Sequence, residues 1–573
     1  MMETRRWFLL PIALAACCLW AGCGRDHYQK SADKEVYGII GKRQAEIFGK
    51  TNGTFSINTP YSSRKPSEIP GPEIIEQRLK SSKRPMTLTD ALKTAVAKSR
   101  EYQFQKEKVY LTALTLTSER YDFKPKWAAS STAAFTRNSS GQLDQSIRSD
   151  FSVTQLLKSG GQLSVSMIND ALSYYSGGGI HYTTPFFATF TQPLLRGAGY
   201  QIATEDLTQA ERNVVYDIRS FARYEQTFAV DIVTSYYRLL QQREVIRNDY
   251  GTYQNLSRAR EQAEALSVDR MAAYQVDQVR QDELTAKSRY ISDSQDYRNS
   301  LDNFKIKLGM PVGEELMLDD LPLEELRKAS LPMLSLTDDR AHQIAVQHRL
   351  DLQNDIDKFE DSKRKIEVAA DQLRPDLKVF GGVTLNQSQG YDYSRFDVNQ
   401  YQALGGVELK LPLDRLKERN LFRSSLISFE QQLRSLSLSL DNVRNEVRQG
   451  LRTLEQKRKD YDIQMAAVNL AKRRVESATL LLQAGRAQMR DMLDAQSSLL
   501  IALNAFTKVL VDYHAARWSL LTNLGVIRTD IDFFWAAEQP IPQPEGRGAP
   551  AVEAKAAPQP LKEELIPPDR LFR

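Results

Sequence analysis

Long stretches of the chain place apolar residues three or four positions apart, the spacing that puts them on one face of a helix. Glycine and proline are sparse through residues 201–310 and 420–525, so few breakers interrupt this pattern. It predicts long helices with polar outer faces, one of them of roughly 60 residues and about 90 Å between Pro193 and Leu266. The return segment to Leu308 would measure about 60 Å. Helices this long indicate a helical hairpin or part of a helical tube. The clearest stripe is Phe221, Tyr224, Phe228, Ile232, Tyr236 and Leu239.

Shorter segments alternate between apolar and polar residues, the pattern of a strand with two different surroundings. Within 402–411, alternate residues from Ala403 to Leu411 are apolar or glycine, whereas the opposite side carries Gln402, Glu408 and Lys410, with Leu404 and Gly406 mixed in. Residues 379–385 alternate similarly. Charges on one side favour a membrane-spanning strand with lipid outside and water inside. We expect four such strands per chain.

Region 127–192 is longer than its counterpart later in the chain. Two alternating runs within it flank the segment Lys158–Gln162, whose sequence is Lys-Ser-Gly-Gly-Gln. Two such runs around a glycine pair predict an extra hairpin or a long loop. Four strands of about nine to eleven residues cannot close a barrel, and unpaired strand edges are not tolerated in lipid. Other chains must therefore complete the strands, which predicts an oligomer.

The chain carries nearly the same pattern twice, about 250 residues apart. Each copy opens with Leu-Thr-Asp (88–90 and 336–338), runs through a helical stretch to a proline, and continues into strands. Each strand segment ends in Pro-Leu (193–194 and 412–413). From 193 to 266 and from 412 to 485 the spacing is the same 73 residues, and each copy closes at Leu-Gly (308–309 and 524–525). The repeat unit is helix, strand, strand and long helical hairpin.

The first residues form an export signal. Arg5 and Arg6 provide a basic start, residues 7–21 are apolar, and Ala21-Gly22-Cys23 resembles the end of a bacterial lipoprotein signal, in which the cysteine is acylated. Cys17 is the alternative acylation site, and a twin-arginine signal is an alternative export route. All three cysteines lie in this segment, so a mature chain has no disulfide.

The remaining boundaries follow from composition. Residues 1–22 are assigned to the signal peptide and 23–85 to a polar tether rich in turn formers. The repeats occupy 86–325 and 326–530, and the Pro- and Ala-rich tail 531–573 is predicted to be disordered. Beyond the signal, no segment approaches the roughly 18 consecutive apolar residues of a membrane helix.

Charge and chemistry exclude several classes of function. The net charge of +5 is small for 573 residues and is spread along the chain, which gives no support to nucleic-acid binding. The five histidines are scattered, and no phosphate-binding loop, dinucleotide fingerprint or nucleophile elbow is present. We therefore expect no enzyme and no cofactor other than a covalent lipid on Cys23.

Four motifs in order resemble those of TolC-like outer-membrane efflux proteins, over roughly residues 85–530. They are Thr-Gln-Pro-Leu-Leu-Arg-Gly at 191–197, His-Arg-Leu-Asp-Leu at 348–352, Leu-Pro-Leu-Asp at 411–414, and the stretch from Gly485 to Gln496. The resemblance implies a mainly α fold with a β-barrel portion. Three copies would form one twelve-stranded transmembrane barrel in the bacterial outer membrane, continued by a periplasmic α-helical barrel.

The same resemblance implies partners and sites. The homotrimer would dock on a periplasmic adaptor protein and an inner-membrane pump, and would conduct drugs, toxins or metals without chemistry. Asp491 and Asp494 match aspartates at the periplasmic pore entrance, where three copies would gather six carboxylates that attract cations. Departures at Leu482 and Ala487, where the family has a tyrosine and an arginine, put its gating lock in doubt. The helical tips that would contact the adaptor are Leu266, Ser267, Gly485 and Arg486.

Two further predictions concern the role of the Pro-Leu segments and the function of the whole chain. Gln192, Pro193 and Pro412 are expected to form the swivel at which strand becomes helix, because proline fixes φ and ends strand pairing. The alternative function is a lipid-anchored periplasmic coiled-coil adaptor or scaffold without a pore. Such adaptors usually have one hairpin flanked by lipoyl-like β motifs, whereas this chain has two hairpins with paired strands.

Overall fold

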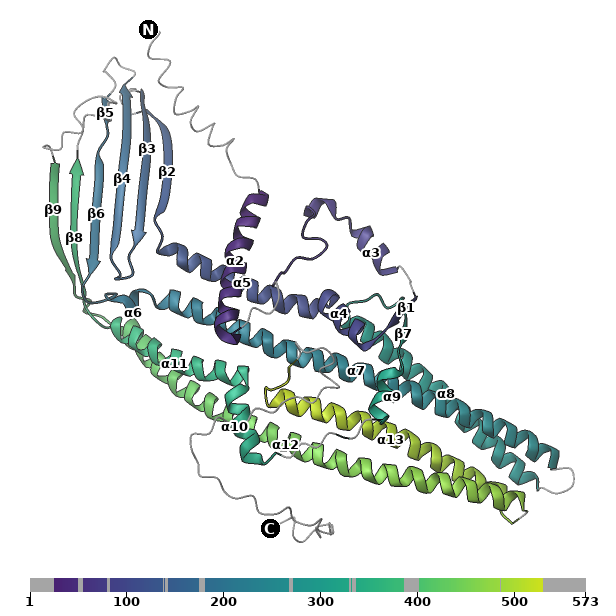
Figure 1. Ribbon diagram of the computed structural model, residues 1–573. Helices are drawn as coiled ribbons and strands as arrows, with labels where there is room; N and C mark the ends of the chain where they lie inside the picture. The colour runs from purple at the N-terminus through teal and green to yellow at the C-terminus, as the bar shows by residue number, and fades with distance from the viewer. Residues whose placement is uncertain are drawn as a thin grey trace. The chain divides into compact units, whose positions relative to one another are not determined.

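A computed structural model describes residues 25–49, 55–79, 83–137, 139, 143–174, 181–266, 272–328, 331, 336–385, 401–484 and 486–528 (Figure 1). The predicted repeat is visible in the order of its elements. The first copy contains α4 (Leu88–Lys98), α5 (Arg100–Asp122), five strands, the short α6 (Tyr200–Ala203), and the helical hairpin α7 (Glu205–Leu266) and α8 (Ala273–Lys307). The second contains α10 (Asp338–His348), α11 (Leu350–Asp371), two strands, and the hairpin α12 (Leu416–Gln483) and α13 (Met489–Asn523).

The long helices match the length that their periodicity predicts. Helix α7 has 62 residues and α12 has 68, while the return helices α8 and α13 have 35 each. Among the described helices, α13 alone is long and apolar enough to cross a membrane, and a third of its most apolar window is buried. Its buried residues include Leu510, Trp518 and Leu521, which is what a core helix between α7 and α12 would also show.

One sheet gathers strands from both copies. Six of its strands run in the order β2 (Lys126–Arg137), β3 (Leu143–Leu156), β4 (Gln162–Tyr174), β6 (Phe186–Pro193), β8 (Asp376–Leu385) and β9 (Tyr401–Lys410). A short β5 (His181–Thr183) pairs with β4, and all pairings are antiparallel. The expectation of four strands per chain is wrong, because the extra hairpin predicted in region 127–192 enters the sheet as β3 and β4.

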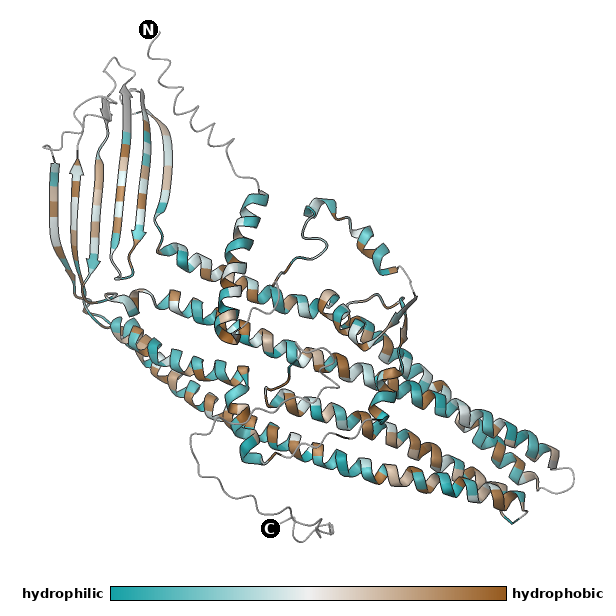
Figure 2. Cartoon of the chain, viewed as in Figure 1, coloured by the Kyte–Doolittle hydropathy of each residue, from teal (hydrophilic) through white to brown (hydrophobic). Residues whose placement is uncertain are grey.

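The register gives this sheet two chemically different faces. Trp127 lies opposite Val153, Val153 opposite Val165, Val165 opposite Ala188, and Ala188 opposite Val383, so one apolar row crosses five strands. Adjacent strands alternate in step, and the alternation can be followed along β3 and β4 in Figure 2. The apolar side chains of this face include Trp127, Ala129, Phe135, Ile147, Phe151, Val153, Leu163, Val165, Met167, Phe186, Ala188, Phe190, Val379, Val383, Leu385, Ala403, Val407 and Leu409, and the same face also carries Ser131, Ser149, Gln155, Asn169 and Gln192.

Most side chains on the opposite face are polar or charged, and its apolar exceptions include Ala128, Ala134, Leu156, Ile168, Phe187, Phe380 and Leu404. Its side chains form short-range ion pairs along the strands, with 3.3 Å between Arg148 Nε and Asp150 Oδ1 and 2.9 Å between Lys410 Nζ and Glu408 Oε1. The face comprises Ser130, Thr132, Arg148, Asp150, Ser152, Ser164, Ser166, Thr189, Thr191, Lys378, Thr384, Gln402, Glu408 and Lys410. The alternation predicted for 402–411 is therefore continuous across the whole sheet.

The predicted tether at 23–85 is partly wrong. Residues 25–48 form a 24-residue helix, α2 (Arg25–Phe48), whose Val36, Ile39 and Ile40 are buried against α5 and α7. Tyr110 on α5 donates a hydrogen bond of 2.8 Å to Asp33 on this helix. The helix is followed by η1 (Pro66–Glu68), α3 (Gly71–Leu79) and β1 (Lys83–Met86), which pairs in parallel with β7 (Glu315–Leu318) before α9 (Leu321–Lys328). The segment therefore belongs in large part to the folded body.

Ionic contacts join the two copies along α7 and α11. The carboxylate of Asp361 on α11 is 3% exposed and forms ion pairs with Arg212 on α7 and with Arg364, the latter at 2.8 Å. Tyr216 donates to the same carboxylate at 2.6 Å. Because a buried carboxylate is costly without partners, these contacts fix α7 against α11 in one register.

The two Leu-Gly pairs close the copies in the same way. In each, the glycine has a positive φ (75° at Gly309 and 73° at Gly525), its N–H binds a carbonyl three residues earlier, and the next N–H binds one five residues earlier. This is the Schellman ending that favours glycine. A Cβ on Gly309 would overlap the carbonyl of Lys98 at the break between α4 and α5. A Cβ on Gly525 would overlap that of His348 at the break between α10 and α11.

We predict that Gly309→Ala and Gly525→Ala each destabilise the fold by about 1–3 kcal/mol, because both the left-handed backbone and the close carbonyl disfavour a side chain. The measurement is the midpoint of thermal loss of helical circular dichroism. Gly313→Ala is the matched control, since its Cβ would meet no atom within 4 Å. Equal midpoints for all three variants would contradict this account of the closure.

Candidate functional site: hairpin tips and strand-to-helix junction

The predicted swivel lies where the sheet passes into the long helices. Pro193 is the last residue of β6, and Pro412 follows β9 directly after Leu411. The side-chain amide of Gln192 donates to the carbonyls of Ser159 and Pro193 at 3.1 and 3.0 Å. Its oxygen accepts from the Ser159 hydroxyl at 2.9 Å. The glutamine thus joins the end of β6 to the turn between β3 and β4.

The junction also joins the two copies to each other. The N–H of Gly197 donates to the buried carboxylate of Asp371 at 2.7 Å, and the N–H of Leu194 donates to Leu377 at 2.8 Å. On the other side, Arg415 donates to the carbonyl of Leu373 at 2.5 Å. The end of α11 is therefore held both by the segment after β6 and by the segment after β9. A hinge role for Gln192, Pro193 and Pro412 stays a prediction.

The two aspartates expected at the entrance lie at the start of α13. Asp491 completes a capping box: its carboxylate accepts from the Gln488 N–H at 3.0 Å, and the Gln488 side chain accepts from the Asp491 N–H. Asp494 is exposed, and its Oδ2 lies 4.0 Å from Arg490 Nε. Asp491 therefore caps the start of the helix, whereas the carboxylate of Asp494 takes no part in capping and is exposed to solvent.

A third carboxylate belongs to the same region. Burial, and then the negative charge of Asp494, raise the pKa of Asp282 on α8. The two groups come from different hairpins and are separated by more than 200 residues in sequence, so sequence spacing gave no signal of their proximity. Asp282 and Asp494 form one acidic pair near the tips, and we refer to it below as the tip carboxylates.

A small apolar core holds the two hairpins together beside these charges. It consists mainly of alanines and branched residues from α7 and α8, with one leucine from α13. Small side chains at these positions allow the helices to approach closely. The buried members are Leu256, Ala259, Ala263, Val279, Ala286 and Leu493.

Only some of the predicted adaptor-contact residues lie in the described part of the chain. Leu266 is the last residue of α7, and Ser267 and Gly485 lie outside the described residues, as does Cys23. Arg486 is exposed just after α12, and its N–H binds the carbonyl of Leu481 at 2.8 Å. The structure therefore places Arg486 at a solvent-facing tip and leaves its binding role a prediction.

An acid pair with one buried member lies further along the first hairpin. Asp249 on α7 is 1% exposed and faces Asp293 on α8. Burial, reinforced by Asp293, raises the pKa of Asp249 to about 7, while Arg289 acts in the opposite direction. In the sequence, Asp249 belongs to the polar pattern of a long helix and looks like an ordinary solvated carboxylate, so spacing alone does not reveal this pair.

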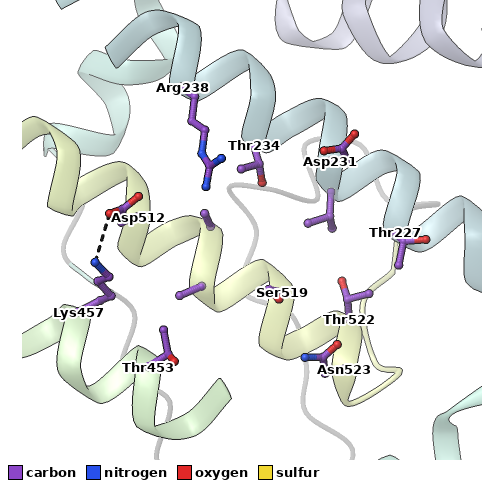
Figure 3. Close-up of a pocket in the computed structure, with 13 residues that line it drawn as sticks. Thr227, Asp231, Thr234, Arg238, Thr453, Lys457, Asp512, Ser519, Thr522 and Asn523 are labelled. Atoms are coloured by element: carbon purple, nitrogen blue, oxygen red, sulfur yellow. Dashed lines mark hydrogen bonds and ion pairs between the residues drawn. The ribbon is translucent and has the colours of Figure 1, made fainter. Parts of the chain in front are cut away.

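A groove of 540 Å³ lies between α7, α12 and α13 (Figure 3). Lys457 and Asp512 form an ion pair of 3.2 Å across it, and Arg238 and Asp231 reach it from α7. Alanines, serine and threonines make up most of the remaining lining. Within the described ranges, no group of three or more His, Cys, Asp or Glu side chains could hold a metal ion.

Solved structures of outer-membrane channels share this fold. The chain superposes on CusC, whose structures concern transmembrane channel formation, with a TM-score of 0.57 and 12% identity, over 76% of this chain and 92% of that one. VceC of Vibrio cholerae gives 0.56 and 14%, over 76% and 96%. The Campylobacter jejuni CmeC channel gives 0.55 and 15%, over 76% and 85%. No protein-family model and no curated protein sequence matches the chain.

These similarities confirm, at the level of fold, the resemblance carried by the four sequence motifs. The identities of 12–15% are too low to transfer a substrate, a partner or a residue's role. They show that the chain has the fold of solved outer-membrane channels.

We predict that the helical body is more stable at pH 6 than at pH 8. The folded-state pKa of Asp249 is raised above its unfolded value, so folding favours the protonated form, and that stability is lost as the pH rises through about 7. Asp249→Asn should remove most of this dependence and raise the unfolding free energy at pH 8 by at least about 1 kcal/mol. The measurement is chemical unfolding followed by circular dichroism at both pH values. Asp441→Asn, at an exposed position on α12, is the control. A wild-type stability that is equal at pH 6 and 8 would contradict the prediction.

Proposed function

We propose that the chain is one subunit of a trimeric bacterial outer-membrane channel, the exit duct of a tripartite efflux or type I secretion system. In this account it is a passive conduit for small molecules or proteins delivered by an inner-membrane pump through a periplasmic adaptor. The helical body would form the periplasmic part of the duct, and the sheet would cross the outer membrane.

The observation that carries this proposal is the two-faced sheet. A largely apolar face over six strands, with charged side chains on the other face, is suited to lipid on one side and water on the other. The apolar residues are not covered within a single copy: Trp127 is 68% exposed, Phe135 67% and Val407 66%. A sheet in a soluble protein would cover such a face with another layer.

The need for further copies comes from both parts of the chain. In the part that the structure describes, β2 and β9 each pair with a neighbour on one side only. The long helix α12 leaves large apolar side chains exposed in one copy. A second copy of the same chain would cover both kinds of surface. These side chains include Leu416, Leu421, Leu433, Leu438, Ile463 and Leu470.

Acylation at Cys23 would add a lipid anchor to the strands. This part of the proposal rests on the sequence motif alone. Loss of metabolic palmitate labelling in Cys23→Ser would support it, whereas continued labelling would point to Cys17. The scaffold alternative leaves the apolar face of the sheet without a role.

Single-channel recording in planar bilayers tests the proposal. The purified full-length protein should insert as a stable oligomer, conduct ions and prefer cations. The scaffold alternative predicts no conductance and release of the protein from membranes by salt or alkali.

We predict that Asp494→Asn reduces the preference for cations, because it removes one of the tip carboxylates from every copy in the assembly. The measurement is the reversal potential in a potassium chloride gradient. Asp441→Asn, on the same hairpin but away from the tips, should leave it unchanged. Asp491→Asn is a poorer probe, since it also removes the capping box of α13. Equal reversal potentials for Asp494→Asn and wild type would remove the tip carboxylates from the selectivity mechanism.

A further inference from the structure

We infer that the β3–β4 hairpin is a membrane-spanning insertion that raises the number of main strands in each copy to six, so that three copies form an eighteen-stranded barrel with a wider outer opening. This inference rests on the proposed channel function and goes beyond it. It replaces the twelve strands that the sequence resemblance implies. The class of solute that it concerns is bulky hydrated cargo too wide for a twelve-stranded opening.

The hairpin lies inside the sheet and not at its edge. All twelve residues of β2 pair with β3, from Lys126 opposite Thr154 to Arg137 opposite Leu143. On the other side, β4 pairs with β6 from Gln162 to Met167. Strands β3 and β4 have 14 and 13 residues, more than the nine to eleven that a tilted strand needs to span a bilayer.

The hairpin continues both faces of the sheet. Phe151, Val153, Val165 and Met167 extend the apolar face, while Arg148, Asp150, Ser152, Ser164 and Ser166 extend the polar one. The hydroxyls of Ser131 and Ser149, which fall on the apolar face, form a hydrogen bond with each other at 3.0 Å. A hairpin folded back into water would need neither the apolar continuity nor this pairing of hydroxyls.

The turn of the hairpin packs closely against the strand-to-helix junction. Gly160 has a φ of 86°, and a Cβ there would overlap the carbonyl of Gly197. A Cβ on Gly161 would overlap the side chain of Gln192. The Gly199 N–H also binds the carbonyl of Ser159, at 3.2 Å. Because the turn packs here, the inserted strands begin at the same level as β6 and cross the full height of the sheet.

Insertion of two strands preserves the way in which copies can join. Strand β2 runs away from the helices and β9 runs back toward them, so the two edges of a six-stranded sheet remain antiparallel to each other. One inserted strand would have made them parallel. Since barrel diameter grows about linearly with strand number, eighteen strands should give an opening roughly 1.5 times as wide as twelve.

The first test compares the full-length protein with a variant that lacks residues 143–174. In the variant, β2 would pair with β6 in place of β4. Trp127 would then lie opposite Ala188, as Val165 does in the full-length protein, so the apolar face is preserved. Polyethylene glycols of graded size are added to each side of single channels in turn. We expect the largest polymer that enters from the strand side to be about 1.5-fold wider in the full-length protein. The cut-off from the helix side should be unchanged and serves as the internal control.

A second test needs only full-length protein and covers the case in which the deletion does not fold. Val165→Cys and Ser166→Cys place thiols on opposite faces of β4. In outer membranes, a membrane-impermeant thiol reagent should modify Ser166→Cys and lower its conductance, but should not reach Val165→Cys. Equal modification of both would place the hairpin in water and overturn the inference.

The outcomes separate this inference from the proposed function. Conduction by both proteins with the same strand-side cut-off would overturn only the eighteen-stranded arrangement. Absence of conduction by the full-length protein would instead reject the channel function on which the inference rests.

Discussion

The rest of the structure depends on the backbone hydrogen bonds at the two edges of the sheet. Each unpaired N–H or C=O in hydrocarbon costs several kcal/mol, and β2 alone offers a twelve-residue edge. In the described part of the chain, the edges of β2 and β9 find no partner within one copy. If the apolar face lies in lipid, this cost can be removed only by another copy. The even number of strands and the antiparallel order are the features that let identical copies meet edge to edge.

The same requirement explains why the junction between strands and helices is so heavily bonded. A closed ring of strands must connect to a helical body built from the same copies, so the positions at which β6 and β9 leave the sheet have to be fixed. Asp371, Gln192 and Arg415 hold these exits, and the contact between Gly197 and Asp371 crosses between the two repeats. Farther along, Gly309 and Gly525 end the helical hairpins of the two repeats with the same backbone conformation and the same hydrogen bonds.

Much of this architecture could be predicted from the sequence, because it depends on signals between residues close together in the chain. Helix length follows from the apolar stripe of α7 and the scarcity of breakers, and closure of the repeats follows from Leu-Gly, because a Schellman ending favours glycine. Strand β9 was predictable because polar or charged residues alternate with apolar ones over most of its length, with Leu404 and Gly406 as exceptions. In α2, by contrast, Val36, Ile39 and Ile40 have helical spacing, but the turn formers beyond residue 50 obscured it.

The features that sequence reasoning missed depend on contacts between distant residues. Strands β3 and β4 could be recognised as a hairpin, yet their place between β2 and β6 is set by register over the whole sheet. Asp282 meets Asp494 only because two hairpins from different repeats pack together. Asp249 looks like any solvated carboxylate until α8 brings Asp293 against it. Such pairs have no signature in spacing.

The most direct measurement of the central claim is disulfide cross-linking between the edges of different copies. Cysteine at Ala129 on β2 is combined in turn with cysteine at Ala403, Gly405 or Val407 on β9, all on the apolar face. After oxidation in membranes, at least one pair should give covalent dimers and trimers on denaturing gels and nothing larger, because a ring of three copies is closed. Monomers alone for every pair, or a ladder that continues beyond three, would contradict the account.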